Sequence, residues 1–154
     1  MYQGLLHTHS LLRWFLLIAL IGAVVLAISG LMGKKGYNST TDKFRKFTVI
    51  FAHIQLLIGL VLYFISPMVQ QGLSDMKAAM ASKSLRFVTV EHTLMMLIAI
   101  VLITIGSAKA KRQTDDSQKY KKLAIWFGIA LVLILAAIPW PFRAEIGKSL
   151  FPGM

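Results

Sequence analysis

The chain contains no cysteine. This absence excludes disulfide bonds, thiolate catalysis, iron–sulfur clusters and the covalent attachment of c-type haem, because each of these needs a cysteine sulfur. Familiar catalytic signatures are missing as well: the sequence has no HExxH zinc motif, no phosphate-binding glycine loop and no convincing Ser-His-Asp set. The sequence therefore does not indicate the common hydrolase or nucleotide-binding chemistries.

Acidic residues are scarce, with six Asp and Glu against 17 Lys and Arg in 154 residues, and 56% of the chain is hydrophobic. A chain this apolar is unlike an ordinary soluble domain, whose surface carries dispersed charge. A basic balance is compatible with nucleic-acid binding, but these Lys and Arg stand at the ends of apolar runs, where they anchor to lipid headgroups. We therefore predict a lipid bilayer as the partner, and no nucleic acid.

Four apolar runs predict membrane-spanning helices at about 5–32, 44–66, 86–107 and 122–139, each long enough for a bilayer. The predicted fold is an all-α integral membrane protein, an antiparallel bundle of four transmembrane helices that forms one domain over 1–154. The first residues, 1–4, lack the basic region of a cleavable signal, so we expect the first run to be retained. The more polar stretch 68–85 predicts a short helix on the membrane surface.

The Lys and Arg residues predict the orientation of these spans. They concentrate in the segments after the first and third spans, which the positive-inside rule places in the cytoplasm. We therefore expect a multi-pass protein of the bacterial inner (plasma) membrane with both termini in the periplasm. The residues in these two segments are Lys34, Lys35, Lys43, Arg45, Lys46, Lys109, Lys111, Arg112, Lys119, Lys121 and Lys122.

Two ionisable residues, Arg13 and Glu91, lie a few residues inside the same predicted boundary, on helices of opposite direction. A charge at the centre of a bilayer costs about 2.5–3.5 kcal/mol on insertion scales, so each needs a partner or a function. One interpretation is an ion pair between them. The alternative is that Arg13 faces a haem propionate or a quinone headgroup, while Glu91 orients a histidine or relays a proton.

Histidines inside the spans are candidate haem ligands, because b-type haem needs no covalent link and histidine is a common axial ligand. Counting 1.5 Å per residue from the predicted boundary, His92 lies about 9 Å deep and His53 about 20 Å deep. Two arrangements follow: an outer site that combines His92 with His9 or His7 beside a deeper site at His53, or one haem that joins His53 to His92 if a helix is shifted.

His7 and His9 stand two residues apart and therefore cannot share one face of a helix. In an extended chain they could help to bind copper or zinc. The candidate metal ligands are therefore His7, His9, His53 and His92. On the third span, a stripe of small and flexible side chains on the face of His92 would suit a flat macrocycle, although such a stripe also serves ordinary packing.

Four stretches of the chain resemble a known family: 7–14 (HTHSLLRW), 52–59 (AHIQLLIG), 86–92 (RFVTVEH) and 138–143 (IPWPFR). They look like those of small bacterial four-span membrane proteins commonly labelled cytochrome-b-like. The resemblance implies haem b held by His53 and His92, and then by His9, with Arg13 and Glu91 close by.

The leading functional hypothesis is electron transfer, in which haem b exchanges electrons with a quinone or a respiratory partner. The main rival hypothesis is a non-catalytic accessory subunit of a larger membrane complex. In that case the small-residue faces, together with Arg13 and Glu91, would mediate assembly with another membrane protein or a second copy. A third hypothesis is a periplasm-facing protein that binds or transports a metal through His7, His9 and His92.

Overall fold

The computed structural model describes residues 1–151, and all regular structure within them is helical. Four helical runs are long and apolar enough to cross a membrane. They are α1 (Tyr2–Met32), α2 (Ser39–Ile65), the run Lys83–Arg112 that contains α6 (His92–Arg112), and α7 (Asp116–Ala137). The prediction of an all-helical, four-span membrane protein is confirmed.

Short helices form the connection between α2 and α6. The sequence predicts one surface helix here, but the structure has three, α3 (Pro67–Ser74), α4 (Met76–Ala81) and α5 (Lys83–Arg86), followed by the π-helix η1 (Phe87–Glu91). The side chains of Ser66, Asp75 and Ser82 each accept a hydrogen bond from the first turn of the next helix. These caps satisfy free N–H groups and divide the segment into separate turns.

The long helices extend further than hydropathy predicts. The second span starts at Ser39 rather than near residue 44, and the fourth at Asp116 rather than near residue 122. Asn38 accepts a hydrogen bond from the Thr41 N–H and Asp115 from the Gln118 N–H, so both starts are capped. The helices therefore include basic residues that hydropathy assigns to loops.

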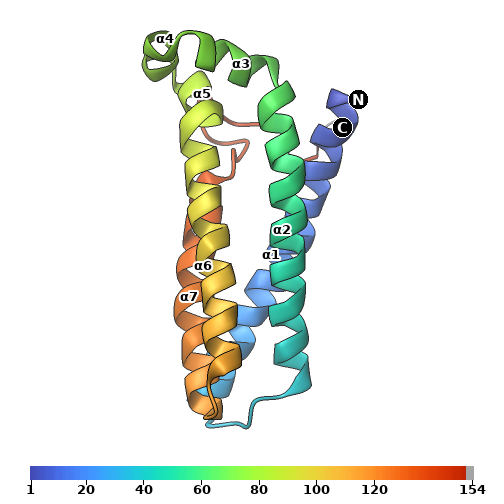
Figure 1. The fold of residues 1–154 in the computed structure, drawn as a ribbon, viewed down its shortest axis with the longest axis vertical. Coiled ribbons are helices and arrows are strands. Elements are labelled where there is room, and N and C mark those ends of the chain that lie inside the picture. Colours follow the sequence, from blue (N-terminus) through green and yellow to red (C-terminus); the bar gives the residue numbers. More distant parts are fainter. Residues whose placement is uncertain (152–154) are drawn as a thin grey trace.

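The helices run alternately up and down, and the N-terminus and the end of the described chain at residue 151 lie at the same end as α3, α4 and α5 (Figure 1). α1 packs against α2 and α7, and α6 packs against α7, whereas α2 and α6 share the least extensive contact of these neighbours. We call the end with the termini the terminal end. The basic end is the opposite one, with the turns at 33–38 and 113–115.

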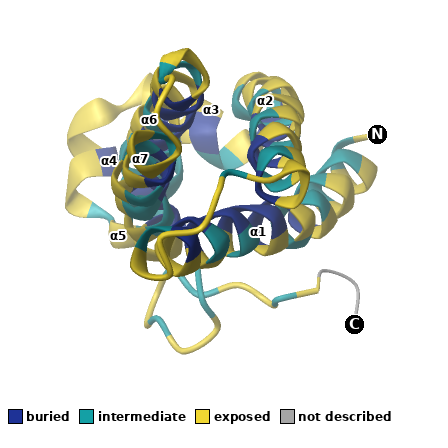
Figure 2. Cartoon of the chain, turned by 90° about the horizontal axis from the view of Figure 1, so that it is seen from below, coloured by how far each residue is buried: buried dark blue, intermediate teal, exposed yellow. Residues whose placement is uncertain are grey.

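Small residues let the helices approach closely inside the bundle. Ala19, Ala23 and Ala27 are buried, as their four-residue spacing predicts, and the buried strips of the long helices face inward (Figure 2). Gly106 of α6 lies against the Cβ atom of Trp126 on α7, where a methyl group would overlap it. Close packing in this bundle thus depends on side chains with little or no volume.

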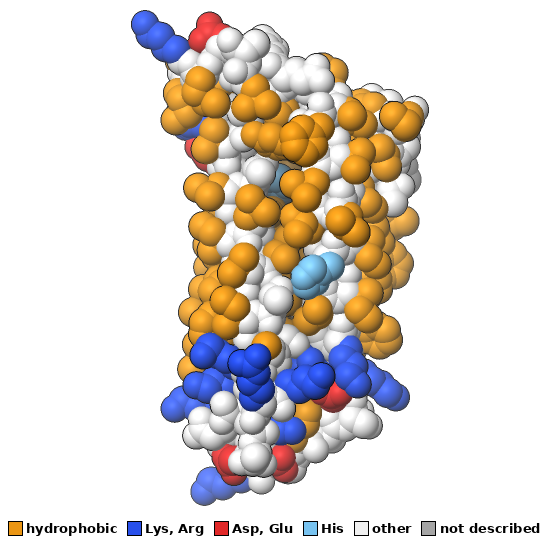
Figure 3. All heavy atoms as spheres, viewed as in Figure 1, with side chains coloured by type: hydrophobic (Ala, Val, Ile, Leu, Met, Phe, Trp, Pro, Cys, Tyr) orange, Lys and Arg blue, Asp and Glu red, His pale blue; other side chains and the backbone are white. Residues whose placement is uncertain are grey.

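The outer surface between the two ends is apolar. Large hydrophobic side chains such as Ile18, Phe64 and Val132 are 64–70% exposed. Figure 3 shows hydrophobic side chains along the long helices and a belt of Lys and Arg at the basic end. Such a surface suits contact with lipid hydrocarbon, with the basic belt at the level of the headgroups.

Candidate functional site

A cavity of about 470 Å³ lies in the half of the bundle nearer the terminal end, where the long helices contribute its lining residues. Its walls are mainly apolar and come from α1, α2, α3, η1, α6, α7 and the C-terminal tail. Pockets of this size commonly hold cofactors or other small molecules. The polar side chains on its wall are Tyr2, His9, Ser10, Arg13, Gln55, Tyr63, Ser66, His92, Thr93, Lys148 and Ser149.

His9 projects into the cavity from α1, because the helix starts at Tyr2 and carries this residue on its inner side. Its ring packs against Gly59 of α2, where a Cβ atom would lie 3.2 Å from His9 Cε1. Gln55 Nε2 donates to the His9 carbonyl at 2.8 Å and ties the two helices together. Within residues 1–151, the buried Nδ1 atom of His9 has no hydrogen-bond partner.

His92 enters the cavity from α6, directly after the π-helix η1. Single π-helical turns are rare and often accompany functional sites. The His92 Nδ1 atom lies 2.8 Å from the Ala137 carbonyl oxygen of α7, which can only accept a hydrogen bond. Nδ1 therefore carries the proton, and in the neutral ring Nε2 keeps its lone pair for a ligand.

Two prolines make the Ala137 carbonyl available. In a continuing helix, the carbonyls of Leu135 and Ala137 would accept from residues 139 and 141, but both positions are proline and have no N–H. Trp140 Nε1 donates to the Leu135 carbonyl at 2.8 Å, and His92 Nδ1 donates to the Ala137 carbonyl. The Pro-Trp-Pro sequence thus fixes the ring of a histidine on another helix.

The rings of His9 and His92 approach each other across the cavity. Their centroids lie 6.4 Å apart, and their planes make an angle of 65°. Metal–imidazole bonds are about 2 Å long, so two histidines on opposite sides of one ion have centroids about 6 Å apart. The observed spacing would allow the two imidazoles to bind one metal ion. Of the alternatives open from the sequence, the structure brings together His92 and His9.

Arg13 and Glu91 do not form the ion pair that the sequence suggests. Arg13 Nη2 donates to the Leu150 carbonyl of the tail at 2.7 Å, and its buried Nε atom has no partner within residues 1–151. Glu91 instead accepts from Arg86 Nε at 2.6 Å. The π-helix explains this pairing, because its wider turn places residues five apart on one face.

The other two histidines lie outside the cavity. His53 is exposed on α2, with Nδ1 donating to the Val49 carbonyl at 2.7 Å and Nε2 lying 3.4 Å from Thr104 Oγ1. His7 is exposed on α1 and points away from His9, because the segment is helical rather than extended. The extended His7–His9 pair is therefore not formed. The described residues contain no cluster of three or more His, Asp or Glu side chains arranged to hold a metal ion.

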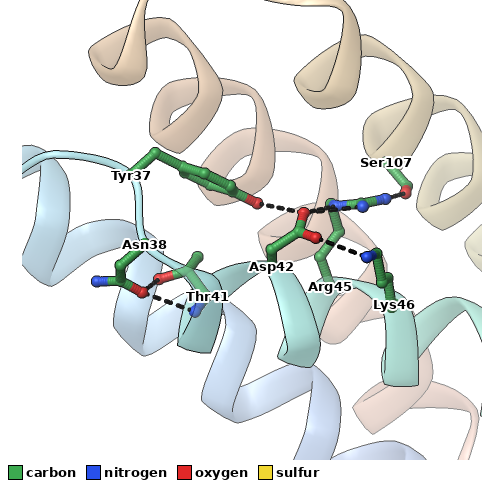
Figure 4. A network of polar contacts seen from close by, with 7 residues as sticks. All are labelled: Tyr37, Asn38, Thr41, Asp42, Arg45, Lys46 and Ser107. Carbon is green, nitrogen blue, oxygen red and sulfur yellow. Dashed lines mark hydrogen bonds and ion pairs between the residues drawn. The ribbon is translucent and has the colours of Figure 1, made fainter.

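A second polar cluster, missed by the sequence reasoning, lies at the basic end (Figure 4). Arg45 is only 6% exposed; its Nε donates to Asp42 Oδ1 at 2.9 Å and its Nη1 donates to Ser107 Oγ at 2.7 Å. The Tyr37 hydroxyl donates to the same carboxylate at 3.3 Å. Burial, with the nearby Asp42 charge, raises the pKa of Tyr37 to about 12. Each polar group has a partner, which fits a structural clamp between α2 and α6.

Two sequence signals could have located the cavity. The Pro-Trp-Pro sequence ends the helix whose Ala137 carbonyl binds His92, and Gln55 and Gly59, four residues apart, both contact His9. No protein-family model, curated protein or solved structure matches the chain. The resemblance to cytochrome-b-like proteins thus stays a prediction.

Proposed function

We propose that this protein is a b-type-cytochrome-like electron carrier that binds haem b in the cavity through His9 and His92. The observation that carries the proposal is the 6.4 Å spacing of these two rings inside an apolar cavity of about 470 Å³. When bound, haem supplies one-electron redox chemistry.

The residues of the cavity suit an iron-bound macrocycle. His92 has the arrangement typical of a metal-ligating histidine, with one nitrogen bonded to a backbone carbonyl and the other free. Gly59 leaves room beside His9, and the apolar wall excludes water, which influences redox potential. Arg13, with its unpartnered Nε, would offer a cation to a haem propionate.

The cellular setting belongs to the same proposal. The excess of Lys and Arg at the basic end favours an orientation with that end in the cytoplasm and the terminal end in the periplasm of a bacterial inner membrane. Electrons would then pass between a haem near the periplasmic side and a membrane quinone or a respiratory partner. The lipid-facing surface supports access for such partners within the bilayer.

The test is a reduced-minus-oxidised absorption spectrum of protein purified in mild detergent from its natural host. We expect a b-type haem spectrum in the wild type and its loss in His9→Ala and His92→Ala. His53→Ala is the matched control and should keep the spectrum, because His53 lies outside the cavity. Wild-type protein without haem absorbance, or loss of haem only in His53→Ala, would overturn the proposal.

A further inference from the structure

The cavity has one side on which neighbouring helices are not joined by a polar contact. At the level of the histidines, Gln55 ties α2 to α1 and His92 ties α6 to α7. Between α2 and the run of η1 and α6, the described residues form such contacts only above and below this level. Tyr63 donates to the Thr89 carbonyl at 3.1 Å toward the terminal end, and Thr104 lies 3.4 Å from His53 toward the basic end.

Leu60 and Leu97 occupy the interval between these two contacts. Each lies seven residues, or about two helical turns, from the His53–Thr104 contact in the direction of the terminal end, and both line the same cavity. Both side chains are partly exposed, Leu60 at 37% and Leu97 at 39%. They belong to the two neighbouring long helices with the least extensive contact, which makes this side the natural boundary between the cavity and the lipid phase. Figure 3 looks onto this face and shows a histidine recessed among hydrophobic side chains.

The route from the aqueous phase at the terminal end is more obstructed. Met68 and Val69 of α3 cover the cavity there, and Val69 is only 4% exposed. The tail lies against α1, where Arg13 and Ser10 both donate to the Leu150 carbonyl. Lys148 and Ser149 of the tail complete this wall.

We propose that the cavity takes its ligand from the bilayer, through a lateral opening between α2 and α6 that Leu60 and Leu97 gate. The ligand class is an amphiphile that dissolves in hydrocarbon, with an apolar body and a polar or anionic end. The apolar body passes between the leucines, and the polar groups of the ligand meet Arg13, Gln55 and His9, which carry unpartnered buried polar atoms. Haem b is such a molecule, so the inference rests on the proposed function for the identity of the ligand.

The test uses a plugged variant, Leu60→Trp with Leu97→Phe, reconstituted in phosphatidylcholine vesicles. The matched control is Leu57→Trp with Leu94→Phe, because Leu57 and Leu94 are exposed on the same two helices but do not line the cavity. The first measurement is the rate of haem uptake from haem-loaded vesicles. We expect at least a tenfold slower uptake in the plugged variant and an unchanged rate in the control.

The second measurement does not depend on haem. A hydrophobic diazirine dissolved in the vesicles is photolysed, and carbene insertion is mapped by mass spectrometry at Leu16 and Ile100, which line the cavity but are at most 6% exposed. We expect labelling in the wild type and the control, and protection in the plugged variant. Equal labelling of Leu16 and Ile100 in the plugged variant and the wild type would overturn the lateral opening. If the plugged variant is protected from labelling but the wild type contains no haem, the lateral opening is retained and only the proposed cofactor is rejected.

Discussion

Replacing Gly106 by alanine should weaken the contact between α6 and α7. The added methyl group would overlap the Cβ and Cγ atoms of Trp126. A Cβ atom is fixed to its backbone and cannot rotate away, so the two helices must separate. Overpacking of this kind costs about 1–3 kcal/mol. A Gly-to-Ala change in a helix interior also contributes about 1 kcal/mol of stability through helix propensity, which opposes the cost.

Gly128→Ala provides the matched control, because Gly128 is also inside a long helix but a Cβ atom there would meet nothing within 4 Å. The propensity gain then cancels between the variants, and Gly106→Ala should be less stable than Gly128→Ala by about 1–3 kcal/mol. The assay is unfolding by sodium dodecyl sulfate from mild-detergent micelles, followed by far-ultraviolet circular dichroism. Equal stability of the two variants would refute the close approach of α6 and α7 at this position.

Two further predictions concern the basic end. Ser107→Ala should destabilise the protein by about 1.5–3 kcal/mol in the same assay, because the buried Arg45 Nη1 loses its hydrogen-bond partner. An unchanged midpoint of unfolding by sodium dodecyl sulfate would contradict the role of Arg45 as a clamp. The difference in tyrosinate absorbance between wild type and Tyr37→Phe should titrate near pH 12 rather than 10, and Asp42→Asn should lower that pKa. The unfolded chain loses the Tyr37 hydroxyl proton at a lower pH than the folded protein does, so the free energy of unfolding should fall as pH rises from about 10 to about 12. A Tyr37 pKa near 10 in the folded protein would contradict the burial of this residue.

The fold could be predicted from the sequence because membrane spans depend on length and hydropathy, which are local properties. The small-residue stripe of Ala19, Ala23 and Ala27 also identifies its own buried face. These signals need no knowledge of the neighbouring helices. The number of spans, the antiparallel arrangement and the buried alanines therefore agree between sequence and structure.

The histidine pairing could not be predicted in the same way. Helices that are apolar on every side give no periodic signal for their rotation, so the sequence does not tell whether His53 faces the bundle interior or lipid. The spacing of Arg86 and Glu91 is equally uninformative without the π-helix, since residues five apart diverge on an α-helix. Arg45 looks like one more basic residue at a membrane edge until Ser107, 62 positions away, is seen beside it.

The way α7 ends has a consequence for how sequence changes would act on the cavity. The imidazole of His92 is held by a backbone oxygen that is free because α7 ends at Ala137, where Ile138 precedes Pro139 and takes an extended conformation. Replacing both Pro139 and Pro141 so that α7 continues would direct the N–H of residue 141 to this oxygen and leave the ring without its acceptor. The chemistry available to His92 is therefore governed by the residue at which another span stops being helical.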